Sequence, residues 1–137
     1  MNVNKLTEKA QEAVLGAQKL AEEQNHSQID VEHLLLALIN QEDGVVPHVL
    51  RRLDIDVNSI KLQVESELNG QPKSSGITQV HMSQRLNQVF SNAEKEAEQM
   101  EDKYVISKHL LIAIIDVGKS AAGEILTRNG VTRDAIF

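Results

Sequence analysis

Cysteine is absent from the 137-residue chain, and aromatic residues make up only 2% of it. The lack of cysteine excludes disulfides, thiol catalysis and Cys-ligated zinc, and it is typical of a protein kept in a reducing compartment such as the cytoplasm. Because Trp is missing and Phe and Tyr are rare, a buried core must be assembled from Leu, Ile, Val and Ala. Two Pro and seven Gly leave few sites for tight turns, which favours helices over a strand-rich fold.

Two further absences narrow the class of protein. No run of about 18 apolar residues is present, so no segment is predicted to span a membrane, and the first residues lack the apolar stretch of a signal peptide. The net charge of −6 argues against nucleic acid as a partner, because phosphates require a basic surface. The acidic excess is uneven: residues 1–70 carry 6 basic and 12 acidic side chains, whereas residues 71–137 carry 8 of each.

An internal repeat is the strongest signal in the sequence. When the chain is shifted by 76 residues, the segment HLLLALI at 33–39 falls on HLLIAII at 109–115 without a gap. The two copies therefore predict two units of one fold, with loops of matching length. Further matches are Ala17 with Ala93, Ala21 with Ala97, Glu22 with Glu98, Leu50 with Leu126, and Arg52 with Arg128.

Each copy is predicted to contain four helices, because its apolar residues recur every three or four positions. We predict an all-α, eight-helix domain in which two four-helix repeats pack around a pseudo-two-fold axis. The domain is assigned to residues 3–137, with one repeat at 6–70, a linker at 71–81 and the second repeat at 82–137. The expected helices span about 7–24, 31–40, 45–53 and 57–68, then about 83–100, 107–116, 120–128 and 132 onwards.

The second helix of each copy is apolar nearly all round and is therefore expected to be buried. Asp30 is a suitable N-cap for the first of these two helices, whereas Ile106 stands at the matching position in the second copy, with Ser107 as the alternative cap. The last helix is expected to begin near Thr132 and is cut at Phe137, well short of its counterpart in the first copy. We therefore expect a fragment of a longer chain.

Patterns that could bind a nucleotide or catalyse a reaction are better explained structurally. The tripeptide Gly118-Lys119-Ser120 resembles the end of a phosphate-binding loop, but the glycine required five residues earlier is missing, and the repeat places the tripeptide in a turn between helices. The carboxylates near the end of the fifth predicted helix are assigned to a solvated face; they are Glu94, Glu96, Glu98 and Glu101. No nucleophile motif such as GxSxG occurs, so the chain is not expected to be an enzyme.

The histidines also have a structural interpretation. His33 and His109 occupy matching positions at the starts of the two buried helices, without the ligand spacing of a metal site, so we expect them to cap or pack locally. The other three are not expected to form a cluster; they are His26, His48 and His81. No cofactor or metal is therefore expected in this chain.

The two-copy pattern resembles a known family, the amino-terminal Clp repeat domain of the AAA+ unfoldases, and within it the ClpB-type disaggregases. The likeness covers essentially the whole chain. It is carried by NKLTEKAQEA at 4–13, DVEHLLLAL at 30–38 and NQEDG at 40–44, and in the second copy by AEKEA at 93–97 and DKYV at 102–105.

The resemblance implies an eight-helix pseudo-dimer that captures unfolded or aggregated polypeptides for threading by ATPase domains outside this chain. It also implies that the parent protein binds ATP and Mg²⁺, contains a coiled-coil insertion, forms a homohexamer and works in the cytoplasm with a DnaK-type chaperone. The related ClpC and ClpA domains share the fold, so an adaptor-docking domain of a protease-linked unfoldase remains the alternative.

The resemblance further implies a polypeptide-binding site. Thr7 and Asp102 match residues to which the family assigns this role, whereas Lys108 stands where a Glu is expected, which reverses a charge. The family's apolar groove would include the positions of Asn92 and Glu96, which are polar here, so we expect a weaker or displaced groove.

Overall fold

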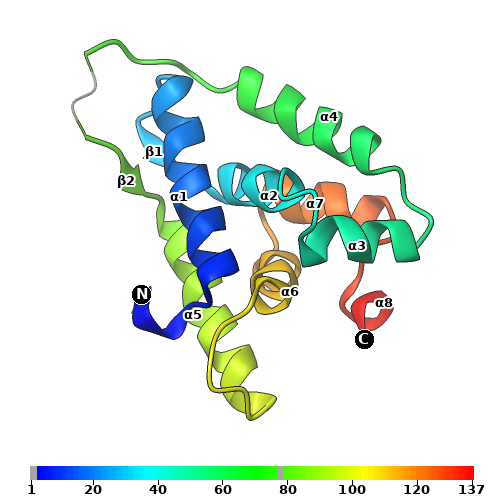
Figure 1. The fold of residues 1–137 in the computed structure, drawn as a ribbon. Coiled ribbons are helices and arrows are strands. Elements are labelled where there is room, and N and C mark those ends of the chain that lie inside the picture. The colour runs from blue at the N-terminus through cyan, green and yellow to red at the C-terminus, as the bar shows by residue number, and fades with distance from the viewer. Residues whose placement is uncertain (1–2, 77–78) are drawn as a thin grey trace.

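The computed structural model describes residues 3–76 and 79–137 and confirms the predicted all-α class (Figure 1). Two residues of the expected linker, 77–78, lie outside the described part of the chain. After a short 3-10 turn at Val3–Lys5, the α-helices are α1 Glu8–Glu23, α2 Val31–Ile39, α3 Val45–Arg52, α4 Val57–Asn69, α5 Gln84–Gln99, α6 Ser107–Val117, α7 Ala121–Arg128 and α8 Arg133–Ile136.

The helices α2 and α6 form the centre of the molecule. Every residue of α2 is buried, and Leu35 and its repeat partner Leu111 are completely inaccessible to solvent. Small side chains let a neighbouring helix approach each central helix closely: α1 packs on α2 through Ala10, Ala13, Ala17 and Ala21, and α5 packs on α6. The remaining helices close the core, with α4 lying across α2 and α7 (Figure 1).

Two short parallel pairings join the halves of the molecule. Strand β1 (Gln28–Ile29) pairs with β2 (His81–Met82), and an isolated bridge pairs Leu6 with Val105. The shift of 76 residues converts the Ile29–Met82 pair into the Val105–Leu6 pair. Each half thus pairs the segment before its central helix with the entry segment of the other half, which gives the pseudo-two-fold arrangement a backbone basis.

The two central helices begin with different residues at the N-cap position. Asp30 caps α2 as predicted, with its carboxylate accepting the backbone N–H of Val31. The expectation for Ser107 is wrong: Ile106 occupies the N-cap position of α6, and it is the ring of His109 that accepts the Ile106 N–H. His33 accepts the N–H of Asp30 in the same way, so both halves use this histidine, and only α2 has a side-chain cap in addition.

The turn that holds the tripeptide of residues 118–120 connects α6 and α7. Gly118 ends α6 with φ of 63°, a left-handed conformation that suits glycine. The Ser120 hydroxyl accepts the backbone N–H of Gly123 and so caps α7. Within the described residues, no helix has the length and apolar character needed to cross a membrane.

Candidate polypeptide-binding surface

Thr7 lies where the two halves meet. Its hydroxyl accepts the backbone N–H of Ala10 at 3.3 Å and caps α1, and its own backbone N–H donates to the carbonyl of Val105 at 3.1 Å. The backbone N–H of Val105 in turn donates to the carbonyl of Lys5 at 2.7 Å. Thr7 is therefore fixed beside the segment that contains the other two candidate residues.

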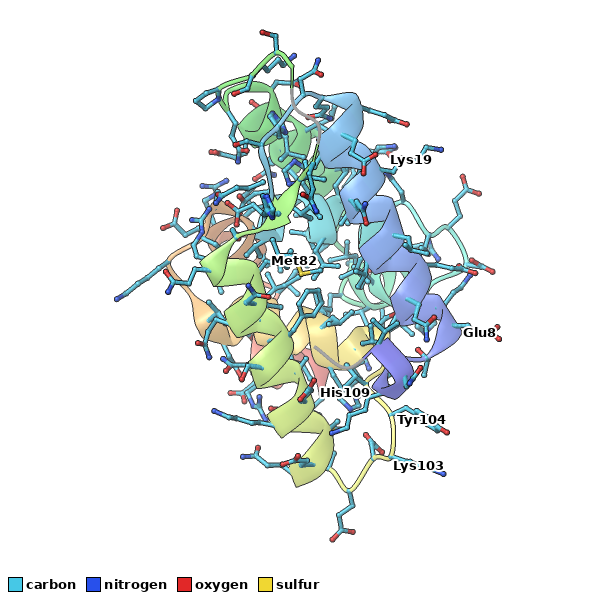
Figure 2. The ribbon with its side chains drawn as sticks, turned by 90° about the vertical axis from the view of Figure 1, so that its left-hand side faces the viewer. Glu8, Lys19, Met82, Lys103, Tyr104 and His109 are labelled. Atoms are coloured by element: carbon cyan, nitrogen blue, oxygen red, sulfur yellow. The ribbon has the colours of Figure 1, made fainter. Side chains whose placement is uncertain are left out.

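Asp102 begins that segment, and it is bound to a buried ring rather than left free in solvent. One of its carboxylate oxygens lies 2.8 Å from Nε2 of His109, whose side chain is fully buried, while the Asp102 side chain stays partly exposed. Because Nδ1 of His109 accepts the Ile106 N–H at 2.9 Å, the ring proton sits on Nε2 and is donated to Asp102. Asp102 thus orients a core histidine. Figure 2 labels this histidine together with Lys103 and Tyr104, which follow Asp102 in the chain.

Lys108 lies next to an aromatic ring. Its ammonium nitrogen is 4.9 Å from the centroid of the Phe137 ring, and the guanidinium of Arg133 is 5.2 Å from the same centroid. Both distances are typical of cation–π contacts. The structure therefore places the three candidate residues around the segment 102–108, each with a different structural partner.

A groove that includes the expected positions Asn92 and Glu96 lies between α5, α6 and α8, and it is polar. It has a volume of about 320 Å³ and is lined by Asn92, Lys95, Glu96, Gln99, Asp116 and Arg133. The assignment of Glu96 to a solvated face is wrong, because its side chain is buried and accepts two hydrogen bonds from the Arg133 guanidinium. Arg133 also pairs with Asp116 at 2.9 Å. Arg133, the first residue of α8, therefore joins Glu96 and Asp116 in a charged network across this groove.

The repeat places a twin of this groove between α1 and α2, with different chemistry. Gly16 stands at the position of Asn92, and Leu20 at the position of Glu96. The twin has a volume of about 380 Å³ and is lined by Glu12, Gly16, Lys19, Leu20, Glu23, Ala37, Asn40 and Gln41. Because its lining includes Gly16, Leu20 and Ala37, this groove is less charged than the groove of the second half.

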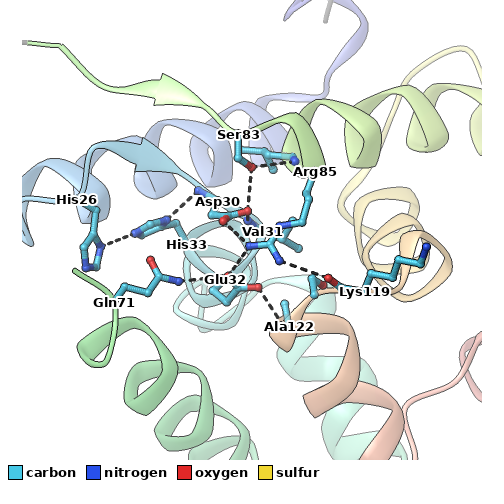
Figure 3. Close-up of polar contacts among 12 residues, drawn as sticks. His26, Asp30, Val31, Glu32, His33, Gln71, Ser83, Arg85, Lys119 and Ala122 are labelled. Carbon is cyan, nitrogen blue, oxygen red and sulfur yellow. Dashed lines mark hydrogen bonds and ion pairs between the residues drawn. The ribbon is translucent and has the colours of Figure 1, made fainter. Parts of the chain in front are cut away.

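The first half contains a buried polar cluster that sequence reasoning missed (Figure 3). The Asp30 carboxylate accepts hydrogen bonds from Ser83 Oγ at 2.8 Å and from the Arg85 guanidinium. Glu32, which is 1% exposed, accepts the backbone N–H of Ala122 at 3.1 Å and lies 3.7 Å from Arg85. The cluster ties the starts of α2, α5 and α7 together.

The two carboxylates of this cluster respond differently to burial. Burial acts to raise the pKa of Asp30, but the hydrogen bonds from Arg85, Val31 and Ser83 outweigh it, so this pKa is lowered. For Glu32 burial dominates over the bond from Ala122, and its pKa is raised. Asp30 is therefore the firm anionic partner of Arg85.

The two halves carry opposite charges at the position of Lys108. Lys108 is the repeat partner of Glu32, and Ile106 is the partner of Asp30. The second half thus lacks both carboxylates of the cluster. Lys9, which matches Arg85 in the repeat, instead forms a surface ion pair with Asp43 at 3.0 Å. The first half carries the acidic version of this position, and the second half carries the basic version.

The histidines were only partly anticipated. The rings of His33 and His109 accept the N–H of the residue at the N-cap, as expected for local caps. The contact between His26 and His33, with 2.8 Å between ring nitrogens, was not expected. It matches the contact between Asp102 and His109, because His26 is the repeat partner of Asp102. Among the described residues, no three His, Cys, Asp or Glu side chains are placed to hold a metal ion.

Comparison with known proteins places this sequence and fold in one class. Residues 5–129 match the Clp repeat (R) N-terminal domain. The chaperone protein ClpB of Clostridium perfringens is 34% identical over 145 residues, which cover 100% of this chain and 16% of that protein. The N-terminal domain of Hsp104 from Candida albicans superimposes with a TM-score of 0.84 at 24% identity, over 96% of this chain and 86% of that one.

A ClpV N-domain in complex with a VipB peptide also has this fold, with a TM-score of 0.77 at 20% identity over 96% of this chain and 81% of that one. The fold and the matched sequence define an N-terminal domain of Clp/Hsp100 AAA+ proteins, a binding or regulatory domain of ATPase parents. The chain belongs to the Clp repeat N-terminal domain family.

Proposed function

We propose that this chain captures unfolded or aggregated polypeptides for a ClpB-type disaggregase. The observation that carries the proposal is the surface around the Leu6–Val105 bridge, where apolar side chains are exposed beside polar groups. Val3 is 57% exposed and Tyr104 is 46% exposed, and both lie within three residues of the bridge. An unfolded polypeptide presents apolar side chains and free backbone groups, and a surface of this kind contacts both.

Thr7, Asp102 and Lys108 supply the polar part of the proposed site. The Asp102 carboxylate is partly exposed and can accept a backbone N–H from a client while it holds His109. The Thr7 hydroxyl is half-buried, and it can donate while it accepts from Ala10. Lys108 adds a positive charge where the first repeat has Glu32, so the site should favour client segments without a basic residue at this point.

The activity of a whole protein lies beyond this chain, which spans 16% of the length of the ClpB relative described above. We propose that the parent binds ATP and Mg²⁺, forms a homohexamer, and works with a DnaK-type chaperone. The complex of a ClpV N-domain with a VipB peptide supports polypeptide binding on this fold. Adaptor docking of the ClpC or ClpA type is the alternative, and it would need a folded partner rather than an unfolded one.

A titration with a labelled, permanently unfolded protein tests the proposal. Thr7→Ala and Asp102→Ala should weaken binding a few-fold, since each removes one polar contact worth about 1 kcal/mol. Tyr104→Ser should weaken it further, because it removes an apolar contact as well. Leu62→Ser is the matched control, because Leu62 is an exposed apolar residue on α4, outside this surface.

Lys108→Glu should change the affinity in a salt-dependent manner, because a charge near the surface acts through a screened field. The titrations are therefore repeated at two salt concentrations, with helical circular dichroism as a check on folding. The unchanged chain is expected to bind the unfolded protein. If the Thr7, Asp102, Tyr104 and Lys108 variants all bind it equally well, the site lies elsewhere on the domain. If the parent binds only folded adaptors, the adaptor-docking alternative is correct.

A further inference from the structure

Two buried histidines face each other at the corner between α1 and α2. Nδ1 of His26 lies 2.8 Å from Nε2 of His33, and the ring centroids are 5.0 Å apart (Figure 3). His26 is 2% exposed and His33 is fully buried. Neither ring takes part in the proposed polypeptide site, so this pair needs its own explanation.

The positions of the protons follow from the hydrogen bonds. Nδ1 of His33 accepts the backbone N–H of Asp30 at 2.9 Å, so the proton of this ring sits on Nε2 and is donated to Nδ1 of His26. The proton of His26 must then be on Nε2, which lies beside the carbonyl oxygen of Leu68 without completing a full hydrogen bond. Both rings are neutral, and each Nδ1 already accepts an N–H. A further proton on either ring therefore breaks a hydrogen bond.

The surroundings of the two rings disfavour a further proton on either of them. Burial and the nearby Lys73 ammonium lower the pKa of His26, although the Leu68 carbonyl opposes this. Burial and the neighbouring His26 lower the pKa of His33 to about 4, and Asp30 offsets this only partly. The Asp30 carboxylate is already committed to Val31, Ser83 and Arg85.

Several contacts near His26 hold one piece of chain in place. The backbone N–H of Ser74 donates to the carbonyl of Asn25 at 2.9 Å, one residue before His26. The Gln71 amide lies 3.4 Å from a carboxylate oxygen of Glu32. Residues 70–74, which we term the strap, follow α4 and are tied by these two contacts to Asn25 and Glu32, the chain neighbours of His26 and His33.

The second half provides a built-in comparison. His109 has the same backbone contact as His33, but its Nε2–H is donated to the carboxylate of Asp102 instead of a second imidazole. A carboxylate compensates a positive ring charge, whereas a neutral imidazole does not. Acid should therefore affect the corner of the first half and spare its twin.

We propose that the His26–His33 pair is a proton-operated latch, which holds the strap against the α1–β1 corner at neutral pH and releases it in mild acid. In the open state both rings are hydrated and take up protons near their ordinary pKa of about 6.5. Because the pKa is lowered in the closed state, closure is fully favoured above that value and is weakened as the pH falls below it. From the value for His33 alone, the open population should rise about twenty-fold between pH 7 and pH 5.

Amide hydrogen exchange of the chain, measured at several pH values and corrected for intrinsic rates, tests this latch. The strap and residues 24–30 should lose protection by about twenty-fold from pH 7 to pH 5, while residues 97–106 keep theirs. Equal protection of the strap at both pH values would overturn the proposal. So would a loss of protection shared by the whole domain, because it would indicate global unfolding instead of a local release.

A reciprocal exchange of residues between the halves sharpens the test. His26→Asp gives His33 the partner that His109 has, and the acid-induced loss of protection at the strap should shrink to under about three-fold. Asp102→His gives His109 a neutral partner and should create a new acid-sensitive corner at residues 97–106. Asp102 is partly exposed, so this second variant is expected to fold even if His26→Asp does not. If Asp102→His shows no added acid sensitivity, the pair is not the latch.

Discussion

The two halves of the molecule have the same order of helices, but they differ in the residues at which each central helix begins. In the first half, Asp30 and Glu32 are buried and neutralised by Arg85, whereas the second half has Ile106 and Lys108 at the matching positions. The order of the helices and the strand pairings are nevertheless equivalent. The difference teaches that apolar periodicity specifies this fold, while the side-chain cap and the buried carboxylates at the start of α2 are an addition that the matching helix α6 lacks.

Truncating the twin core leucines should produce the largest effect and test whether the halves form one core. Leu35→Ala and Leu111→Ala should each lower the free energy of unfolding by about 2–5 kcal/mol, because both side chains are completely buried. Urea denaturation of each variant measures the loss. A loss below about half a kcal/mol at either position would show that the corresponding helix is not central.

Removing the cation of the buried cluster should have a smaller effect than truncating a core leucine. Arg85→Ala leaves Asp30 and Glu32 without their cationic partner, but the Arg85 side chain is 44% exposed and water can replace part of the contact, so we expect a loss of about 1–2 kcal/mol. The matched change Lys9→Ala breaks a surface pair and should leave the denaturation midpoint unchanged. Equal losses would mean that the cluster adds nothing to stability.

The two hydroxyl caps provide the finest comparison. Thr7→Ala removes one cap bond and should cost about 1 kcal/mol. Ser83→Ala removes the equivalent cap bond and also the bond from Ser83 Oγ to the buried Asp30, and should cost about 2 kcal/mol. Thermal unfolding of the pair of variants at neutral pH gives the difference directly. Indistinguishable midpoints would indicate that Asp30 finds another donor.

The fold was predictable because its signals are local or repeated. The helix bounds expected from apolar spacing agree with the structure to within about two residues, and Asp30 and Thr132 cap the helices that they were expected to begin. The parallel pairings of Leu6 with Val105 and of β1 with β2 could not be foreseen. Segments of one or two residues carry no detectable period, and they are set by the packing of the halves.

The polar contacts were harder to predict because they join residues far apart in the sequence. Glu96 lies three residues after Ala93, on the buried face of α5, although a carboxylate ordinarily favours solvent, and Arg133 on α8 makes its burial favourable. Asp30 and Arg85 are separated by 55 positions in the chain. Sequence periodicity describes one helix at a time, so it cannot show which partner helix neutralises a buried charge.

The strand pairings carry a consequence for the origin of the chain. Each half pairs its pre-helical segment with the entry segment of the other, so one half made alone would have both edges unpaired. Two identical halves could satisfy each other by exchanging these segments, and a chain of residues 3–76 should therefore associate into a symmetric, domain-swapped dimer. Joining two such halves in one polypeptide replaces a concentration-dependent encounter with an intramolecular one. Within one polypeptide the copies need not be self-complementary, and here the first has a buried carboxylate pair where the second has Ile106 and Lys108.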